Sequence, residues 1–179
     1  MRILLIDNND SFTRNLEHLL VSAAPGARVT VEPYAWVGGA DLSGWDLIVI
    51  SPGPGCPEEY PDHARVLGSG APVLGVCLGM QVLNGLCGGK TEPLPGCVHG
   101  RSDVVEWRGR KRTVARYHSL HVTRVGRGLA VLAANAQGVP MVLGSRRRRL
   151  LGFQFHPESF LTPEGETFIH DAIEFLGLG

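Results

Sequence analysis

A cysteine framed by two glycines is the residue best placed to do chemistry. Cys77 lies in Gly75-Val-Cys-Leu-Gly79, a G-x-C-x-G pattern typical of a nucleophile on a sharp turn from a strand into a helix. Such a turn crowds the positions two residues to either side, which favours glycine there. The helix N-terminus adds partial positive charge, which favours thiolate over thiol. The pattern predicts a thiol nucleophile, the alternative being a buried core cysteine.

A thiol nucleophile needs a base and a group that orients this base. His156 follows an apolar strand in Gly152-Phe-Gln-Phe-His-Pro-Glu-Ser159, so it should emerge at a strand end, as Cys77 does. Glu158 comes next across Pro157, which restrains the backbone so that the carboxylate can reach the imidazole nitrogen remote from the thiol. We predict a Cys-His-Glu triad.

Other histidines are weaker candidates for the base. His118 lies in a polar cluster between strands, Arg116-Tyr-His-Ser-Leu120, and remains a second candidate. Four more have no comparable neighbours and are interpreted as surface or structural: His18, His63, His99 and His170.

The oxyanion formed by attack on a carbonyl needs backbone N–H donors that can approach closely. The N–H of Leu78, directly after the nucleophile, is one candidate. The Pro52-Gly-Pro-Gly55 loop offers the other, with Gly53 favoured. A rigid turn is the alternative interpretation of this loop. Its position after an apolar strand, where ligands bind in α/β sheets, favours a functional role.

The elements that must position these residues alternate in the first half of the chain. Apolar patterns predict strands at 2–7, 28–31, 45–50 and 73–76 and helices at 12–24, 61–67 and 79–86. Strands that alternate with helices indicate a parallel sheet with crossover helices. The alternating polarity of 28–31 places that strand near a sheet edge.

The second half consists mainly of short strands and predicts an antiparallel or mixed extension. The strands are expected at 90–92, 102–107, 113–115, 130–135, 139–143 and 150–155, and a last amphipathic helix at 163–176. The predicted fold is therefore α/β, with three layers: a flavodoxin-like, mostly parallel central sheet with helices on both faces, plus a smaller antiparallel or mixed sheet. We expect 1–179 to be a single domain.

Charge and composition exclude several classes of function. Lys+Arg and Asp+Glu each number 17, so the formal net charge is zero and gives no sign of a nucleic-acid or membrane partner. No apolar run is long enough to span a membrane. The four cysteines form no C-x-x-C pair and no signal peptide is apparent, so we expect a reducing cytoplasm. The basic runs 108–112 and 146–149 are interpreted as solvated hairpin turns, the alternative being contact with an acidic partner.

Taken together, the motifs resemble those of the class I (triad-type) glutamine amidotransferases. The matching segments are Asp7–Thr13, Ser51–Gly55, Gly75–Gln81, His99–Gly100, Tyr117–Leu120 and Phe155–Ser159. The first of these is similar to the opening of the small subunits of chorismate-using synthases, anthranilate synthase component II and aminodeoxychorismate synthase component II. The resemblance covers essentially the whole chain.

The resemblance implies that Cys77, His156 and Glu158 form the catalytic triad and that L-glutamine is the substrate. It places glutamine against the Gly53-Pro54-Gly55 loop, Gln81 and the backbone of Ser119 and Leu120. It implies no metal or other cofactor in this chain, with Mg²⁺ expected in the partner synthase subunit.

The resemblance also implies that ammonia passes to a chorismate-binding synthase subunit, of which anthranilate synthase of tryptophan synthesis is favoured. The alternatives are aminodeoxychorismate synthase of folate synthesis, a non-catalytic regulatory module, and a hydrolase of γ-glutamyl substrates. Three features depart from the family pattern: Asn9 and Arg14 replace the usual tyrosines, and the stretch 56–71 is short. Asn9 and Arg14 lie by the opening strand, near where family members meet their partner, so contacts with the partner can differ there. The short stretch trims one helix, and no departure touches the triad.

Overall fold

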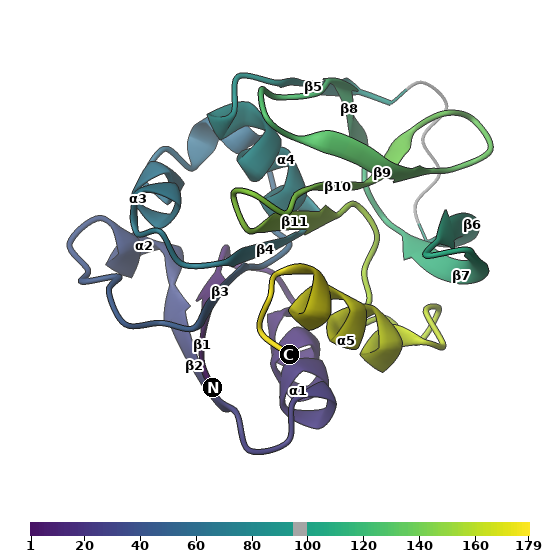
Figure 1. The fold of residues 1–179 in the computed structure, drawn as a ribbon. Coiled ribbons are helices and arrows are strands. Elements are labelled where there is room, and N and C mark those ends of the chain that lie inside the picture. The colour runs from purple at the N-terminus through teal and green to yellow at the C-terminus, as the bar shows by residue number, and fades with distance from the viewer. Residues whose placement is uncertain (95–99) are drawn as a thin grey trace.

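A seven-stranded sheet forms the centre of the protein in a computed structural model that describes residues 1–94 and 100–179 (Figure 1). The strand order is β2-β1-β3-β4-β11-β10-β9. His99, from one of the sequence motifs, and Cys97, one of the four cysteines, lie outside the described residues. The strands are β1 (Arg2–Asp7), β2 (Arg28–Pro33), β3 (Leu47–Ile50), β4 (Val73–Val76), β9 (Ala130–Ala134), β10 (Pro140–Ser145) and β11 (Leu150–Phe153).

The first five strands of this order are parallel to one another. The alternation of strands and helices predicted this for β1 to β4, whereas β11 was expected in the antiparallel or mixed extension. β2 lies at the edge of the sheet, which was also predicted. β11 pairs with β4 so that Gly152 faces Gly75. The chain segments that follow β4 and β11 therefore leave the same end of the sheet side by side.

Helices cover both faces of the sheet, which confirms the three-layer prediction (Figure 1). On one face α1 (Thr13–Ala23) and α5 (Gly165–Phe175) pack against each other and over Ile3, Leu5 and Phe153. On the other face, Leu4 and Ile6 pack beneath α2 (Tyr34–Val37), α3 (His63–Gly68) and α4 (Leu78–Leu86). The side chains of β1 alternate between the two faces, so each strand residue contributes to one core or the other.

Two small antiparallel sheets complete the fold. β5 (Lys90–Pro93) pairs with β8 (Leu120–Arg124), and β6 (Arg101–Trp107) pairs with β7 (Arg110–Arg116). The predicted antiparallel extension is thus divided, because β9, β10 and β11 join the central sheet instead. The sequence analysis missed β8, α2 and the short 3₁₀ helix η1 (Pro57–Glu59). None of the helices in the described residues is long and apolar enough to cross a membrane.

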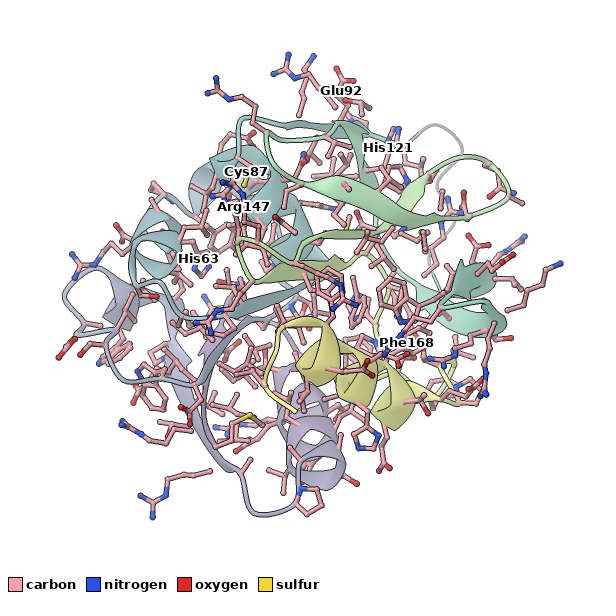
Figure 2. All side chains as sticks on the ribbon, viewed as in Figure 1. His63, Cys87, Glu92, His121, Arg147 and Phe168 are labelled. Atoms are coloured by element: carbon pink, nitrogen blue, oxygen red, sulfur yellow. The ribbon has the colours of Figure 1, made fainter. Side chains whose placement is uncertain are left out.

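The interpretation of the first basic run as a solvated turn is wrong for Arg112, whereas Arg108 lies exposed in the turn as expected. Arg112 is only 5% exposed, donates to Asp171 at 2.8 Å and lies over the ring of Phe168, which Figure 2 labels on α5. Arg108 forms ion pairs with Asp171 and Glu174. These contacts fasten the β6–β7 hairpin to α5. Arg110 and Lys111, at the start of β7, are exposed as expected.

The second basic run is also more than a solvated turn. Arg148 donates to the sulfur of Cys87 at 2.9 Å and to the carbonyl of Arg127 at 3.2 Å. The guanidinium of Arg146 lies 4.7 Å from the centre of the Phe175 ring. This run therefore holds neighbouring elements together.

Two glycines allow β4 to turn directly into α4. A Cβ atom on Gly79 would meet the backbone carbonyl oxygen of Ile50 on β3, and one on Gly75 would meet the backbone of Gly79. Backbone atoms cannot rotate away as a flexible side chain can. The crowding that the G-x-C-x-G pattern predicted is therefore present in the fold.

We expect Gly79→Ala to lower the free energy of unfolding by about 3 kcal/mol, because the added methyl group must displace the backbone of β3. Urea denaturation of the purified chain measures this change. Gly68→Ala is the matched control, since nothing lies within 4 Å of its Cβ position at the end of α3. That variant should be neutral or more stable by up to about 1 kcal/mol. Equal stability of the two variants would contradict the role of Gly79.

Candidate active site

Cys77 occupies a strained backbone conformation between β4 and α4. Its φ of +52° and ψ of −104° lie outside the regions that L-residues normally adopt. Its N–H donates to the carbonyl of Phe153 on β11 at 2.7 Å, and its carbonyl accepts from Gln81 in α4 at 3.3 Å. The neighbouring strand and the helix together hold this conformation. The half-buried thiol is thereby carried at the carboxyl end of the sheet, at the start of a helix.

His156 and Glu158 lie at the same end of the sheet because they follow β11, the strand beside β4. His156 is only 3% exposed, and its Nδ1 lies 2.6 Å from Oε1 of Glu158. The Glu158 side chain has no exposed surface. The structure thus brings together the three residues that were predicted as a triad.

The charges around His156 favour its protonated form. Burial alone would lower the pKa of His156, but the charge and hydrogen bond of Cys77, together with those of Glu158, outweigh this effect. The pKa is therefore raised well above its ordinary value. The imidazole thus lies between two groups that favour its protonated form, the sulfur of Cys77 and the carboxyl group of Glu158.

Two aromatic rings hold the imidazole in place, and the sequence analysis gave neither a role in the site. The rings of Phe12 and Tyr117 contact His156 edge-on, with centroid distances of 5.5 and 5.0 Å. The Tyr117 hydroxyl also lies 3.0 Å from Oγ of Ser159. Both rings come from motifs that carried the family resemblance, which was the signal that could have identified them.

The backbone around His156 is tied to the β6–β7 hairpin. The N–H of His156 donates to the carbonyl of Ala115 on β7 at 3.2 Å. The hydroxyl of Thr162 accepts from the N–H of Ala115 at 2.9 Å and donates to the carbonyl of His156 at 2.7 Å. Thr162 was also missed. One buried hydroxyl therefore locks the base to the hairpin.

A cavity of about 270 Å³ opens beside Cys77 and His156. Every residue of the predicted oxyanion and substrate sites lines this cavity. Glu158 lies behind His156 and does not line the cavity. The lining residues are Asp10, Ser11, Phe12, Pro52, Gly53, Pro54, Gly55, Cys77, Leu78, Gln81, Tyr117, His118, Ser119, Leu120 and His156.

The two predicted oxyanion residues touch each other. A Cβ atom on Gly53 would lie 2.6 Å from Cδ2 of Leu78 and 2.7 Å from Cβ of Asn8. Only glycine fits at this point, so the backbone of the loop can approach the nucleophile closely. Gly53 and Leu78 remain the predicted donors.

A buried polar network supports this loop from below. Asn8 donates through Nδ2 to the carbonyl of Ser51 at 2.9 Å, which turns its Oδ1 toward Nε2 of His63, also at 2.9 Å. Nε2 must therefore carry the proton of His63. The side chain of His63, labelled in Figure 2, has no exposed surface, and burial lowers its pKa to about 4. The interpretation of His63 as structural is confirmed.

His118 is buried in the wall of the cavity. Burial lowers its pKa to about 4, and the charge of Arg116 acts in the same direction. Its Nδ1 lies 2.8 Å from the carbonyl of Leu120, which can only accept, so Nδ1 donates. His118 is thus a neutral hydrogen-bond donor in the site and a poorer base than His156.

No cluster of three or more His, Cys, Asp or Glu side chains that could hold a metal ion occurs in the described parts of the chain.

Comparison with known proteins identifies the family. The sequence model of the class-I glutamine amidotransferases matches residues 4–175. The chain belongs to this family, as its sequence motifs predicted.

Individual relatives and a solved structure show which members of the family the chain is similar to. Anthranilate synthase component 2, pyocyanine specific, from Pseudomonas aeruginosa is 39% identical over 99% of this chain and 95% of its own. Aminodeoxychorismate synthase from Streptomyces griseus is 41% identical over 94% of this chain, which corresponds to 25% of that protein. The crystal structure of a candidate GMP synthase subunit from Thermoplasma acidophilum has a TM-score of 0.84 at 20% identity, covers 98% of this chain and 94% of its own, and supports the fold.

We expect the pKa of His156 to fall in Cys77→Ala, because this change removes the charge and the hydrogen bond of the sulfur, both of which raise that pKa. NMR titration of histidine-labelled protein measures this pKa, and the variant His156→Asn assigns the signal. An unchanged titration in Cys77→Ala would mean that sulfur and imidazole do not interact.

The depressed pKa of His63 predicts a loss of stability in acid. Between pH 6.5 and about 4 the unfolded chain binds this proton and the folded chain does not, so the free energy of unfolding falls as the pH falls. In His63→Gln, whose amide can still donate to Asn8, this loss should be smaller by about 3 kcal/mol at pH 4 than in the parent.

Chemical denaturation at several pH values measures the difference. His170→Gln, at an exposed position of α5, is the matched control. Parallel stability curves for His63→Gln and the parent would contradict the prediction.

Proposed function

We propose that this chain is a glutaminase subunit that hydrolyses L-glutamine through Cys77, His156 and Glu158 and passes ammonia to a chorismate-aminating synthase subunit. One observation carries the proposal. A strained cysteine at the end of β4 and a buried, carboxylate-paired histidine after β11 line the same cavity. Membership of the glutamine amidotransferase family supports the choice of substrate.

In the first half of the reaction the sulfur of Cys77 attacks the amide carbon of glutamine. The carbonyl oxygen becomes an oxyanion, which the N–H groups of Gly53 and Leu78 stabilise, each by about 2.7–4 kcal/mol of barrier. His156 gives its proton to the departing nitrogen, and the C–N bond breaks. The products of this half are ammonia and a glutamyl thioester on Cys77.

In the second half, His156 takes a proton from water, and the resulting hydroxide attacks the thioester carbon. The C–S bond breaks, glutamate leaves and the thiolate is restored beside the imidazolium. Glu158 keeps the ring in one orientation through its 2.6 Å hydrogen bond to Nδ1.

The substrate needs polar partners for its α-amino and α-carboxylate groups. We assign these to the Gly53-Pro54-Gly55 loop, Gln81 and the backbone of Ser119 and Leu120, all of which line the cavity. This arrangement would hold the amide carbon about 3–3.5 Å from the sulfur, the distance at which attack begins.

The partner is inferred from the names of the relatives. Two chorismate-amination systems are represented, anthranilate synthase component 2 and aminodeoxychorismate synthase, and the first matches over nearly its whole length. We therefore favour an anthranilate synthase component I partner, with aminodeoxychorismate synthase component I as the alternative. Mg²⁺ would belong to that partner, and no cofactor is assigned to this chain.

The proposal extends to the state of the free chain. Because ammonia released into water is lost to synthesis, we propose that the chain hydrolyses glutamine weakly alone and faster when the synthase covers the cavity. We further propose that residues 1–179 act as one catalytic domain in the cytoplasm.

Replacing Cys77 by Ser tests the nucleophile. In the complex with the synthase, Cys77→Ser should abolish glutamine-dependent amination of chorismate, because a serine hydroxyl at this site is a far weaker nucleophile. Amination with added ammonium salt should persist, since that reaction takes place in the partner. Both rates are measured by fluorescence and mass spectrometry of the aminated product.

The outcomes separate the candidate functions. Glutamine-dependent turnover that survives Cys77→Ser would refute the nucleophile and favour a non-catalytic module. Anthranilate as the product indicates the tryptophan pathway, and aminodeoxychorismate indicates the folate pathway. Hydrolysis of γ-glutamyl peptides in preference to glutamine would favour the hydrolase.

A further inference from the structure

Two buried glutamine side chains connect the 119–120 segment to the sulfur of Cys77 through a continuous series of hydrogen bonds. Gln81, on α4, is 3% exposed, and Gln154, which follows β11, is fully buried. Gln81 donates through Nε2 to the carbonyl of Leu120 at 3.2 Å and to Oε1 of Gln154 at 3.1 Å. Gln154 then donates through Nε2 to the sulfur of Cys77 at 3.8 Å, within the range of N–H···S hydrogen bonds.

One backbone carbonyl fixes the direction of every hydrogen bond in this series. The carbonyl of Leu120 can only accept, so the NH₂ group of Gln81 must face it. The second hydrogen of that NH₂ group points to Gln154 and requires an oxygen there. The amide of Gln154 is therefore oriented with its NH₂ group toward the sulfur. His118 donates to the same carbonyl at 2.8 Å and helps to hold it in place.

We propose that Gln154 is a positioning residue that holds the sulfur of Cys77 through its side-chain NH₂ group, and that Gln81 acts by orienting Gln154. This inference rests on the proposed role of Cys77 as nucleophile. It gives Gln81 a second role beside the predicted contact with glutamine. The series of hydrogen bonds also links the segment expected to bind substrate, 119–120, to the nucleophile.

An N–H donor stabilises a thiolate more than a thiol, because the hydrogen bond is strengthened by full negative charge. Removing the donor should therefore make the thiolate harder to form. A purely structural pair of buried glutamines would affect stability but would leave the ionisation of the sulfur unchanged. The pH dependence of Cys77 alkylation distinguishes these roles.

The experiment measures alkylation by iodoacetamide of the full chain as a function of pH. The Cys77 peptide is followed by mass spectrometry, so that reaction at other cysteines does not interfere. In Gln154→Met the midpoint of the profile should rise by about one pH unit, which is a tenfold loss of rate below the midpoint. In Gln154→Glu, which places a carboxylate beside the sulfur, the rise should be larger.

Gln81→Met tests the orienting role without touching the sulfur. Its midpoint should rise by less than that of Gln154→Met, because Gln154 keeps its amide but loses the constraint on its orientation. The double variant should resemble Gln154→Met alone, since the two residues act in series. Gln137→Met is the matched control, at an exposed glutamine, and should leave the profile unchanged.

Thermal melting shows whether each variant is folded, and Gln81→Met carries the test if Gln154→Met does not fold. A folded Gln154→Met or Gln81→Met with the parent profile would overturn the proposal. Additive shifts in the double variant would overturn the role of Gln81. Failure of the proposed function is recognised separately, because glutamine-dependent synthesis would then survive Cys77→Ser whatever the alkylation profiles show.

Discussion

The site depends on a contact between two stretches of backbone. Gly79, at the start of α4, lies so close to the Ile50 carbonyl on β3 that no side chain fits between them. This approach lets the chain reverse from strand to helix within a few residues and leaves Cys77 at the tip of the turn. Gly152 on β11 has a related role, because its missing side chain makes room for Met80. The position of the thiol thus depends on the missing side chains of Gly79 and Gly152, which let the neighbouring segments approach closely.

A second constraint is the burial of charge. His156 is almost wholly removed from water, and such a group is protonated only if the surrounding groups compensate for lost hydration. Glu158 and Cys77 provide this compensation on the two sides of the ring. The rings of Phe12 and Tyr117 pack against the imidazole. The geometry of the base and its electrostatics therefore come from the same small group of neighbours.

The sequence was sufficient for those features that depend on local patterns. Glycine spacing predicted the turn at Cys77, and the apolar run before His156 predicted a strand that delivers it to the sheet end. The contacts of Arg112 with Asp171 were not predictable, because a basic run in a hairpin gives no sign of an acidic helix far along the chain. The four-residue α2 is too short for helical periodicity. Gln154 was missed because a glutamine has no chemical signature until the fold places it against a sulfur.

The place of β11 between β4 and β10 has a consequence for the order in which the sheet can form. β4 is synthesised early, but its partner on one side is a strand far later in the chain. Until β11 emerges from the ribosome, β4 presents the unpaired N–H and C=O groups of a sheet edge between apolar side chains, the kind of surface that recruits strands from other chains. Pairings between such distant segments also form slowly. Assembly of the nascent chain is therefore most exposed to aggregation in the same strand that carries the nucleophile.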